Sequence, residues 1–187
     1  RFNTMASTNA VPIVLIHGWK ASVLVDKNTS EEKFNYAFSH LLGFGGPTLD
    51  LPMEWEEDRW SSTSGVKRQA YDDMVASHPT RDVSCLCGAV KLAQLYGPLL
   101  DHLAKKRGRE NVHYFAYDWR RELDETAQKY EAFLEKIISQ YNGMAPQVIG
   151  HSMGCLITLH VLNRRPELFH SILFGAGAMA PIFSGIE

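Results

Sequence analysis

The sequence predicts an α/β protein with an open, mostly parallel sheet and helices on both faces, and three observations support this. Short apolar runs alternate with amphipathic segments along the 187 residues. The first run, residues 11–16, is rich in β-branched residues, as expected of a parallel strand covered on both faces. A Gly-x-Ser-x-Gly turn at residues 150–154 lies between an apolar run and an amphipathic segment. Strands that alternate with helices pair in parallel through right-handed crossovers.

Four strands are expected, each marked by an apolar run that turn-forming residues follow. They cover residues 11–16, 112–117, 147–149 and 171–177. Reactive groups collect at the carboxyl ends of parallel strands. The turns after residues 16 and 149 are therefore the places where we expect a functional site.

Four helices are expected between these strands. They cover about residues 30–42, 98–107, 122–141 and 155–165. Ser30 is the expected N-cap of the first helix. Basic residues followed by Gly108 are typical of the end of the second. The third has an acidic first turn and an apolar stripe at three- and four-residue spacing, and Pro166 ends the fourth.

We expect the chain, residues 1–187, to form a single domain that is truncated after the strand following the Gly-x-Ser-x-Gly helix. Residues 47–83 have no clear periodicity, and such a long segment inside a compact domain is usually functional or disordered. The tryptophans in it, Trp55 and Trp60, either face a lipid or substrate or pin the segment to the core.

The composition is that of a globular protein, with 45% apolar and 21% charged residues. A net charge of −2 gives no reason to expect nucleic acid or an anionic membrane as a partner. No apolar run reaches the roughly 20 residues of a transmembrane span, and no signal peptide is visible. The cysteines, Cys85, Cys87 and Cys155, suggest neither a disulfide framework nor a metal site, and Cys155 is expected to be a buried thiol. A cytoplasmic location is favoured.

The Gly-x-Ser-x-Gly turn is typical of a nucleophile elbow, in which Ser152 would attack an ester carbonyl. Gly150 and Gly154 are needed because side chains two positions before or after the serine would collide at such a sharp turn. The backbone N–H groups of Met153 and Trp19 are the expected donors to the oxyanion.

Two histidines accompany these turns. Gly18 allows a close turn after the first strand, and His17 is expected to be structural or to line the cleft. His151 stands beside Ser152 in the sequence, and its expected role is packing or a supporting hydrogen bond.

Three motifs together resemble the α/β-hydrolase superfamily. They are His17-Gly18-Trp19, Tyr117-Asp118-Trp119-Arg120 and Gly150-His151-Ser152-Met153-Gly154. The Tyr-Asp-Trp-Arg motif is similar to the lecithin–cholesterol acyltransferase-like branch. The resemblance implies an acyl-enzyme on Ser152, lipid ester substrates, no metal or organic cofactor, and a lid-like or lipid-contacting insertion at about residues 43–95. Asp118 and Arg120 have no matching catalytic role and are expected to form a structural ion pair.

A triad acid and base cannot be identified in this sequence. The superfamily order is serine, then an acid, then histidine, with the last two on later strand ends. After Ser152 the candidates are Glu167, Glu187, His160 and His170. His160 is expected to point away from the serine, and His170 and Glu167 precede the fourth strand at the wrong edge of the sheet. The sequence therefore predicts only the nucleophile and oxyanion half of a hydrolase.

Two functions remain open. The first is a serine ester hydrolase or acyltransferase, such as a lipase or phospholipase, acting on lipid esters. The alternative is a non-catalytic, hydrolase-like scaffold that a partner chain completes. In both cases the sheet edge after residue 177 is expected to bind a partner chain or a second copy, because an uncovered strand edge promotes association.

Overall fold

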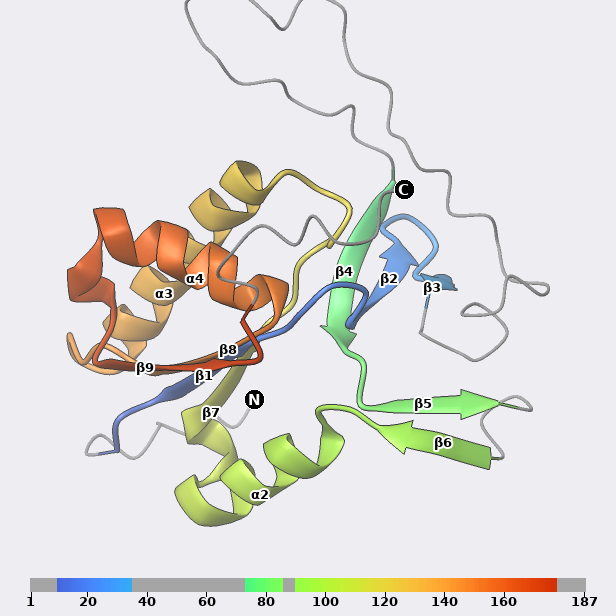
Figure 1. Ribbon diagram of the computed structural model, residues 1–187, viewed down its shortest axis with the longest axis horizontal. Coiled ribbons are helices and arrows are strands. Elements are labelled where there is room, and N and C mark those ends of the chain that lie inside the picture. Colours follow the sequence, from blue (N-terminus) through green and yellow to red (C-terminus); the bar gives the residue numbers. More distant parts are fainter. Residues whose placement is uncertain (1–9, 35–72, 86–89, 178–187) are drawn as a thin grey trace, which may run out of the picture.

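A four-stranded parallel sheet forms the centre of the computed structural model, which describes residues 10–34, 73–85 and 90–177 (Figure 1). The strand order is β7-β1-β8-β9, and every pair is parallel. The strands are β1 (Ile13–Ile16), β7 (Val112–Phe115), β8 (Gln147–His151) and β9 (Ser171–Gly175). All four expected strands are confirmed, and with them the α/β fold class.

Three of the expected helices are also confirmed, as α2 (Gly97–Arg107), α3 (Leu123–Gln140) and α4 (Met153–Arg164). Short 3-10 turns follow α2 and α4, at Arg109–Asn111 and Pro166–Leu168. The helix ends follow the sequence signals. Pro98 lies in the first turn of α2, three basic residues lie in its last turn, and Gly108 ends it with a φ of 85°.

Helices cover both faces of the sheet, because alternate residues of β1 point to opposite sides. Val14 and Ile16 belong to a large buried cluster with residues of α3 and α4. Leu15 faces the other way and packs with Tyr96 and Leu100, at the start of α2. Figure 1 shows α3 and α4 on one side of the sheet and α2 on the other. Hydrophobic burial on both faces explains why the β1 run is continuously apolar.

The prediction of a helix from Ser30 is wrong for the first residues of that helix. Glu32–Phe34 form strand β3, which pairs antiparallel with β2 (Ser22–Asp26). The Asp26 carboxylate accepts the N–H groups of Asn28 and Thr29 at 2.8 and 2.9 Å, and Ser30 has a φ of 61°. This tight turn reverses the chain, so Ser30 ends a hairpin turn and caps no helix. Residues 35–42 lie outside the described part of the chain.

The second correction concerns residues 47–83, part of which is regular. Strand β4 (Met74–Pro79) pairs antiparallel with β2, and β5 (Asp82–Cys85) forms a hairpin with β6 (Val90–Gln94). β4 pairs with the distant strand β2, whereas β5 and β6 are neighbours in the sequence. All three carry polar residues, so no local apolar pattern marks them. Trp55 and Trp60 lie outside the described residues, and the lid-like insertion remains a prediction.

Two further predictions concern Cys155 and membrane-spanning helices. Cys155 is a buried free thiol, as expected. In the described ranges, no helix is both long and apolar enough to cross a lipid bilayer.

Candidate active site

Ser152 lies between β8 and α4, at the carboxyl end of the sheet. Its backbone has φ 52° and ψ −121°, a conformation that residues with a side chain rarely adopt. The Ser152 N–H donates to the carbonyl of Gly175 at 3.0 Å, and the Ser152 carbonyl accepts the N–H of Cys155 at 2.9 Å. The strained turn is therefore held between the end of β9 and the first turn of α4.

The two glycines of the turn allow α4 to approach the sheet. A Cβ on Gly154 would lie 2.5 Å from the carbonyl oxygen of His17 and 2.7 Å from that of Ile16. A Cβ on Gly150 would lie 3.3 Å from the Cα of Cys155. Both positions face backbone, which cannot move aside as a flexible side chain can. The steric reason proposed for Gly-x-Ser-x-Gly thus applies most strongly to Gly154.

The turn after β1 lies directly against Ser152. A Cβ on Gly18 would lie 2.8 Å from the Ser152 Cβ and 3.2 Å from its Oγ. The same point is 3.2 Å from Nδ1 of His151. The fold therefore brings together two turns that are more than 130 residues apart in the sequence, and Gly18 provides the space in which they meet.

The backbone N–H groups of Met153 and Trp19 belong to these two turns. Met153 follows Ser152 in the elbow, and Trp19 follows Gly18 in the turn after β1. Met153 is the first residue of α4, where backbone N–H groups have no intrahelical acceptor. Within the described part of the chain, neither N–H has a hydrogen-bond acceptor. The Trp19 side chain is 57% exposed, meets Trp119 edge-on at 5.8 Å, and lies under the Lys20 ammonium at 4.2 Å. Two free donors beside a serine are suited to stabilising an oxyanion.

His17 is a buried residue that holds the turn after β1 through hydrogen bonds. Its side chain is completely buried, so it does not line a cleft. Nε2 accepts the N–H of Tyr117 at 3.2 Å, so the proton sits on Nδ1, which donates to the Gly18 carbonyl at 2.6 Å. Burial lowers the pKa of His17 from 6.5 to about 4, which keeps the ring neutral near pH 7.

Three tyrosine hydroxyls hold the same turn. The Tyr117 hydroxyl donates to the His17 carbonyl at 2.8 Å, and the Tyr114 hydroxyl donates to the Ala21 carbonyl at 3.1 Å. Burial raises the pKa of Tyr114 and of Tyr117, so both stay protonated and can donate. The Tyr96 hydroxyl accepts the Gly18 N–H at 3.1 Å.

Tyr96 and Tyr114 support the turn after β1, and the sequence did not reveal this role for either of them. Tyr114 lies inside a strand, where an aromatic residue needs no further explanation. Tyr96 lies in a loop directly before α2. No local pattern marks either residue, because the groups that their hydroxyls contact are at least 55 residues away in the sequence.

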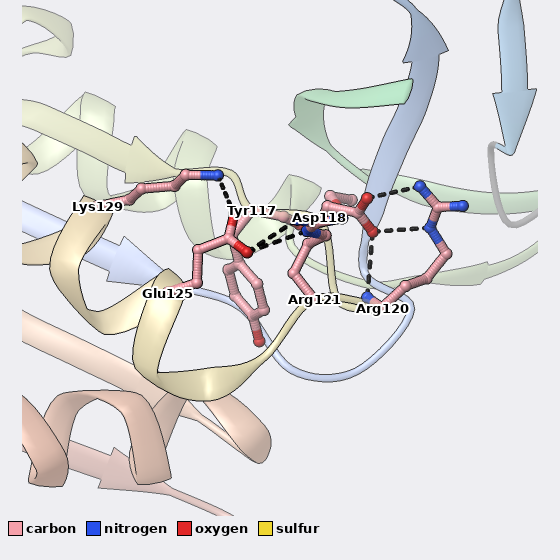
Figure 2. A network of polar contacts seen from close by, with 7 residues as sticks. Tyr117, Asp118, Arg120, Arg121, Glu125 and Lys129 are labelled. Atoms are coloured by element: carbon pink, nitrogen blue, oxygen red, sulfur yellow. Dashed lines mark hydrogen bonds and ion pairs between the residues drawn. The ribbon is translucent and has the colours of Figure 1, made fainter. Parts of the chain in front are cut away.

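The Tyr117–Arg120 motif follows β7 and forms the ion pair drawn in Figure 2. The Asp118 carboxylate accepts hydrogen bonds from Nε and from one terminal nitrogen of Arg120, at 2.9 and 2.6 Å. It also accepts the Arg120 N–H at 3.1 Å. The Arg120 side chain is fully buried, and a buried guanidinium needs such a partner. Trp119, which lies between Asp118 and Arg120 in the sequence, is buried, and its ring contacts that of Trp19.

A second charged group in Figure 2 fixes the beginning of α3. Glu125 accepts hydrogen bonds from Arg121 at 2.9 Å and from Lys129 at 2.6 Å. Burial by itself raises the pKa of Glu125, but the two cations outweigh this effect and lower it. The group stabilises the loop that follows the ion pair and makes no contact with Ser152.

The candidate acids and bases are far from Ser152. His160 contacts Asp124 of α3 at 3.0 Å. His170 precedes β9, and its N–H donates to the carbonyl of Pro146 at 2.9 Å, at the amino ends of the strands. Glu167 pairs with Arg165 beside it. Glu187 lies outside the described ranges.

A cavity of about 290 Å³ lies apart from these turns. Its walls come from β4, α2 and β7 and include Arg81, Leu100 and Tyr114. Gly18, Trp19, His151 and Ser152 do not line it, so we do not assign it to an ester substrate. In the part of the chain that the structure describes, no three His, Cys, Asp or Glu residues are placed to hold a metal ion.

Known proteins match the part of the chain that contains the ion pair and the elbow. The family model described as lecithin:cholesterol acyltransferase matches residues 84–170. A phosphatidylcholine-sterol acyltransferase of Rattus norvegicus is 43% identical over 61 residues, and that of Mus musculus is 39% identical over 61 residues. An uncharacterized protein of Saccharomyces cerevisiae is 36% identical over 77 residues.

These matches are partial. The two acyltransferase matches cover 31% of this chain and 14% of each relative, and the yeast match covers 40% and 12%. The chain therefore corresponds to a minor part of the relatives' length. The matched segment nevertheless contains β7, α3, β8 and α4, together with both the Tyr-Asp-Trp-Arg and the Gly-x-Ser-x-Gly motifs. Over this segment and in its parallel sheet, the chain is similar to the lecithin:cholesterol acyltransferase-like branch of the α/β-hydrolases.

Proposed function

We propose that this chain provides the nucleophile and oxyanion half of a serine ester hydrolase or acyltransferase that acts on lipid esters. The observation that carries the proposal is the contact between Gly18 and Ser152, where an added Cβ would lie 2.8 Å from the serine Cβ. This contact brings the N–H of Trp19 to the same edge as Ser152 and the N–H of Met153. Acyl transfer requires a nucleophile and oxyanion donors of this kind, together with a base.

In the proposed reaction, the Ser152 oxygen attacks the ester carbonyl and its proton passes to a base. The carbonyl oxygen becomes an oxyanion that accepts the N–H groups of Met153 and Trp19, each worth about 3 kcal/mol. Collapse of the intermediate breaks the ester bond, expels the alcohol with a proton, and leaves an acyl-serine. Water or a second alcohol then takes the acyl group. Among the described residues no hydrogen bond joins the Ser152 hydroxyl to a base, so the proposal requires a base from outside the described ranges.

Two observations support a lipid ester as the substrate class. The rat and mouse relatives are named as acyltransferases of phosphatidylcholine and sterol. Trp19 places a 57% exposed indole beside the proposed oxyanion donor, and exposed indole rings are suited to contact both apolar chains and polar headgroups. Whether the acceptor is water or an alcohol separates a hydrolase from an acyltransferase, and both fit the same nucleophile.

The test is active-site labelling with a fluorophosphonate probe, on this chain and on the longest natural polypeptide that contains it. We expect labelling that Ser152→Ala abolishes and that Ser77→Ala, a change at an exposed serine of β4, leaves in place. If the longest polypeptide is unlabelled, or if Ser152→Ala labels as the wild type does, the enzyme proposal is wrong.

The alternative is a scaffold that a partner chain completes, and one observation favours it. In the described part of the sheet β9 is an outer strand, and Leu173 and Phe174 on it are 62% and 37% exposed. Apolar side chains on an open strand promote association. Failure of labelling together with a dimer or complex that Leu173→Lys disrupts would favour the scaffold.

A further inference from the structure

The Tyr96 hydroxyl connects the two turns that meet at Ser152. It accepts the Gly18 N–H at 3.1 Å and lies 2.6 Å from Nδ1 of His151. Gly18 precedes Trp19, and His151 precedes Ser152, so each partner is next in sequence to a residue of the proposed site. The Tyr96 side chain packs against the sheet from the side of α2 and is buried.

The hydrogen positions follow from the partners. A backbone N–H can only donate, so the hydroxyl oxygen accepts from Gly18. With His151 in its Nε2–H tautomer, the tyrosine proton is directed at the lone pair of Nδ1. The result is a chain of two hydrogen bonds that runs in one direction, from Gly18 through Tyr96 to His151, and successive bonds of this kind strengthen each other.

We propose that Tyr96 is a positioning residue that sets the separation between the Gly18–Trp19 turn and the Ser152 elbow. The proposal rests on the proposed function, because it concerns the placement of the Trp19 N–H relative to the Met153 N–H. The Trp19 donor follows the Gly18 peptide, and the Tyr96 hydroxyl holds that peptide to the residue beside the nucleophile. Small displacements of a donor have large effects on reaction rate.

Tyr114 offers a matched control. Its hydroxyl also bonds the turn after β1, at the Ala21 carbonyl, but it touches neither Gly18 nor His151. Its ring lies 6.2 Å from that of Tyr96 on the same face of the sheet. Tyr96→Phe and Tyr114→Phe therefore remove the same group from the same region, and only the first removes the connection between the two turns.

The experiment measures fluorophosphonate labelling over a range of probe concentrations, on the longest natural polypeptide that contains this chain. We expect Tyr96→Phe to lower kinact by about tenfold to a hundredfold with little change in KI, because positioning affects the reaction and not the binding of the probe. Tyr114→Phe is expected to lower kinact by less than about threefold, while the two variants shift the thermal midpoint by similar amounts, within about 4 °C.

A second pair of variants tests the other end of the connection and does not depend on the folding of Tyr96→Phe. In His151→Asn the amide oxygen can take the place of Nδ1 as acceptor, whereas His151→Leu has no acceptor. We expect His151→Leu to lose kinact as Tyr96→Phe does, and His151→Asn to recover most of that loss.

The outcomes separate the two proposals. No labelling of the wild type at Ser152 overturns the proposed function and this inference with it. Labelling that Ser152→Ala abolishes, but that Tyr96→Phe and Tyr114→Phe reduce equally, overturns the positioning role alone. Equal losses in His151→Asn and His151→Leu also overturn it, because His151 would then act in some way other than as the acceptor for Tyr96.

Discussion

The elbow around Ser152 and the turn after β1 lie in contact, yet different forces hold them. The elbow is held by backbone: Gly154 packs on the carbonyls of Ile16 and His17, and Ser152 takes a strained conformation between β9 and α4. The turn after β1 is held by hydrogen bonds to side chains of distant segments.

This difference predicts which changes disrupt the structure of each turn. A backbone contact at van der Waals distance leaves no room for a methyl group, so the elbow should tolerate almost no substitution at its glycines. Hydrogen bonds from buried side chains depend on the protonation and the polar atoms of those side chains. The turn after β1 should therefore respond to pH and to the loss of single hydroxyl groups.

The largest effect is expected at the elbow. Gly154→Ala places a Cβ 2.5 Å from a backbone oxygen, so we expect a loss of about 3 kcal/mol or more in the free energy of unfolding, or failure to fold. Gly175→Ala is the matched control, because its Cβ would lie 3.6 Å from the nearest atom, and it should cost less than about 1 kcal/mol. Urea unfolding measures both, and equal losses would contradict the backbone account of the elbow.

The next effect is an acid sensitivity of the turn after β1, due to His17. Its pKa is lowered from 6.5 to about 4 in the folded protein. Between these values the unfolded chain binds a proton that the folded protein does not. Stability from this group is therefore complete above pH 6.5 and is lost as the pH falls toward 4, by up to about 3 kcal/mol.

Urea midpoints at pH 7, 5.5 and 4.5 measure this loss. His17→Asn cannot titrate in this range, so its stability should fall less steeply over the same interval. Because the carboxylates of both proteins titrate alike, the difference between the two curves isolates His17. Parallel curves would show that protonation of His17 does not weaken the turn.

The smallest effect on stability is expected at Trp19. Its exposed ring contacts Lys20 and Trp119, and losing such contacts in Trp19→Ala should cost less than about 1 kcal/mol. The backbone N–H remains in that variant and is absent from Trp19→Pro. Fluorophosphonate labelling should therefore fall far more in Trp19→Pro. Equal labelling of the two would remove Trp19 from the proposed oxyanion site.

The two turns also differ in how much of each could be predicted from the sequence. Gly150, Ser152 and Gly154 are close together in the chain and serve one local geometry, so their spacing identified the turn and its place between strand and helix. The Tyr96 hydroxyl contacts Gly18 and His151, which are 78 and 55 residues away in the sequence, and no spacing rule covers such distances. The helix expected from Ser30 was wrong for a different reason, because the turn at Asp26–Ser30 and the pairing of β3 with β2 outweigh the local helical pattern.

The amino-acid sequence by itself determined the parallel core, its helices on both faces, and the Gly-x-Ser-x-Gly turn, because apolar periodicity and glycine sterics act over a few residues. The tertiary structure decided which side chains hold the turn after β1, and that Gly18 lies against Ser152. It also decided the polar strands β3 to β6, whose stability depends on pairing with another strand. Contacts between paired or distant segments exist only after the chain has folded, and local periodicity does not report them.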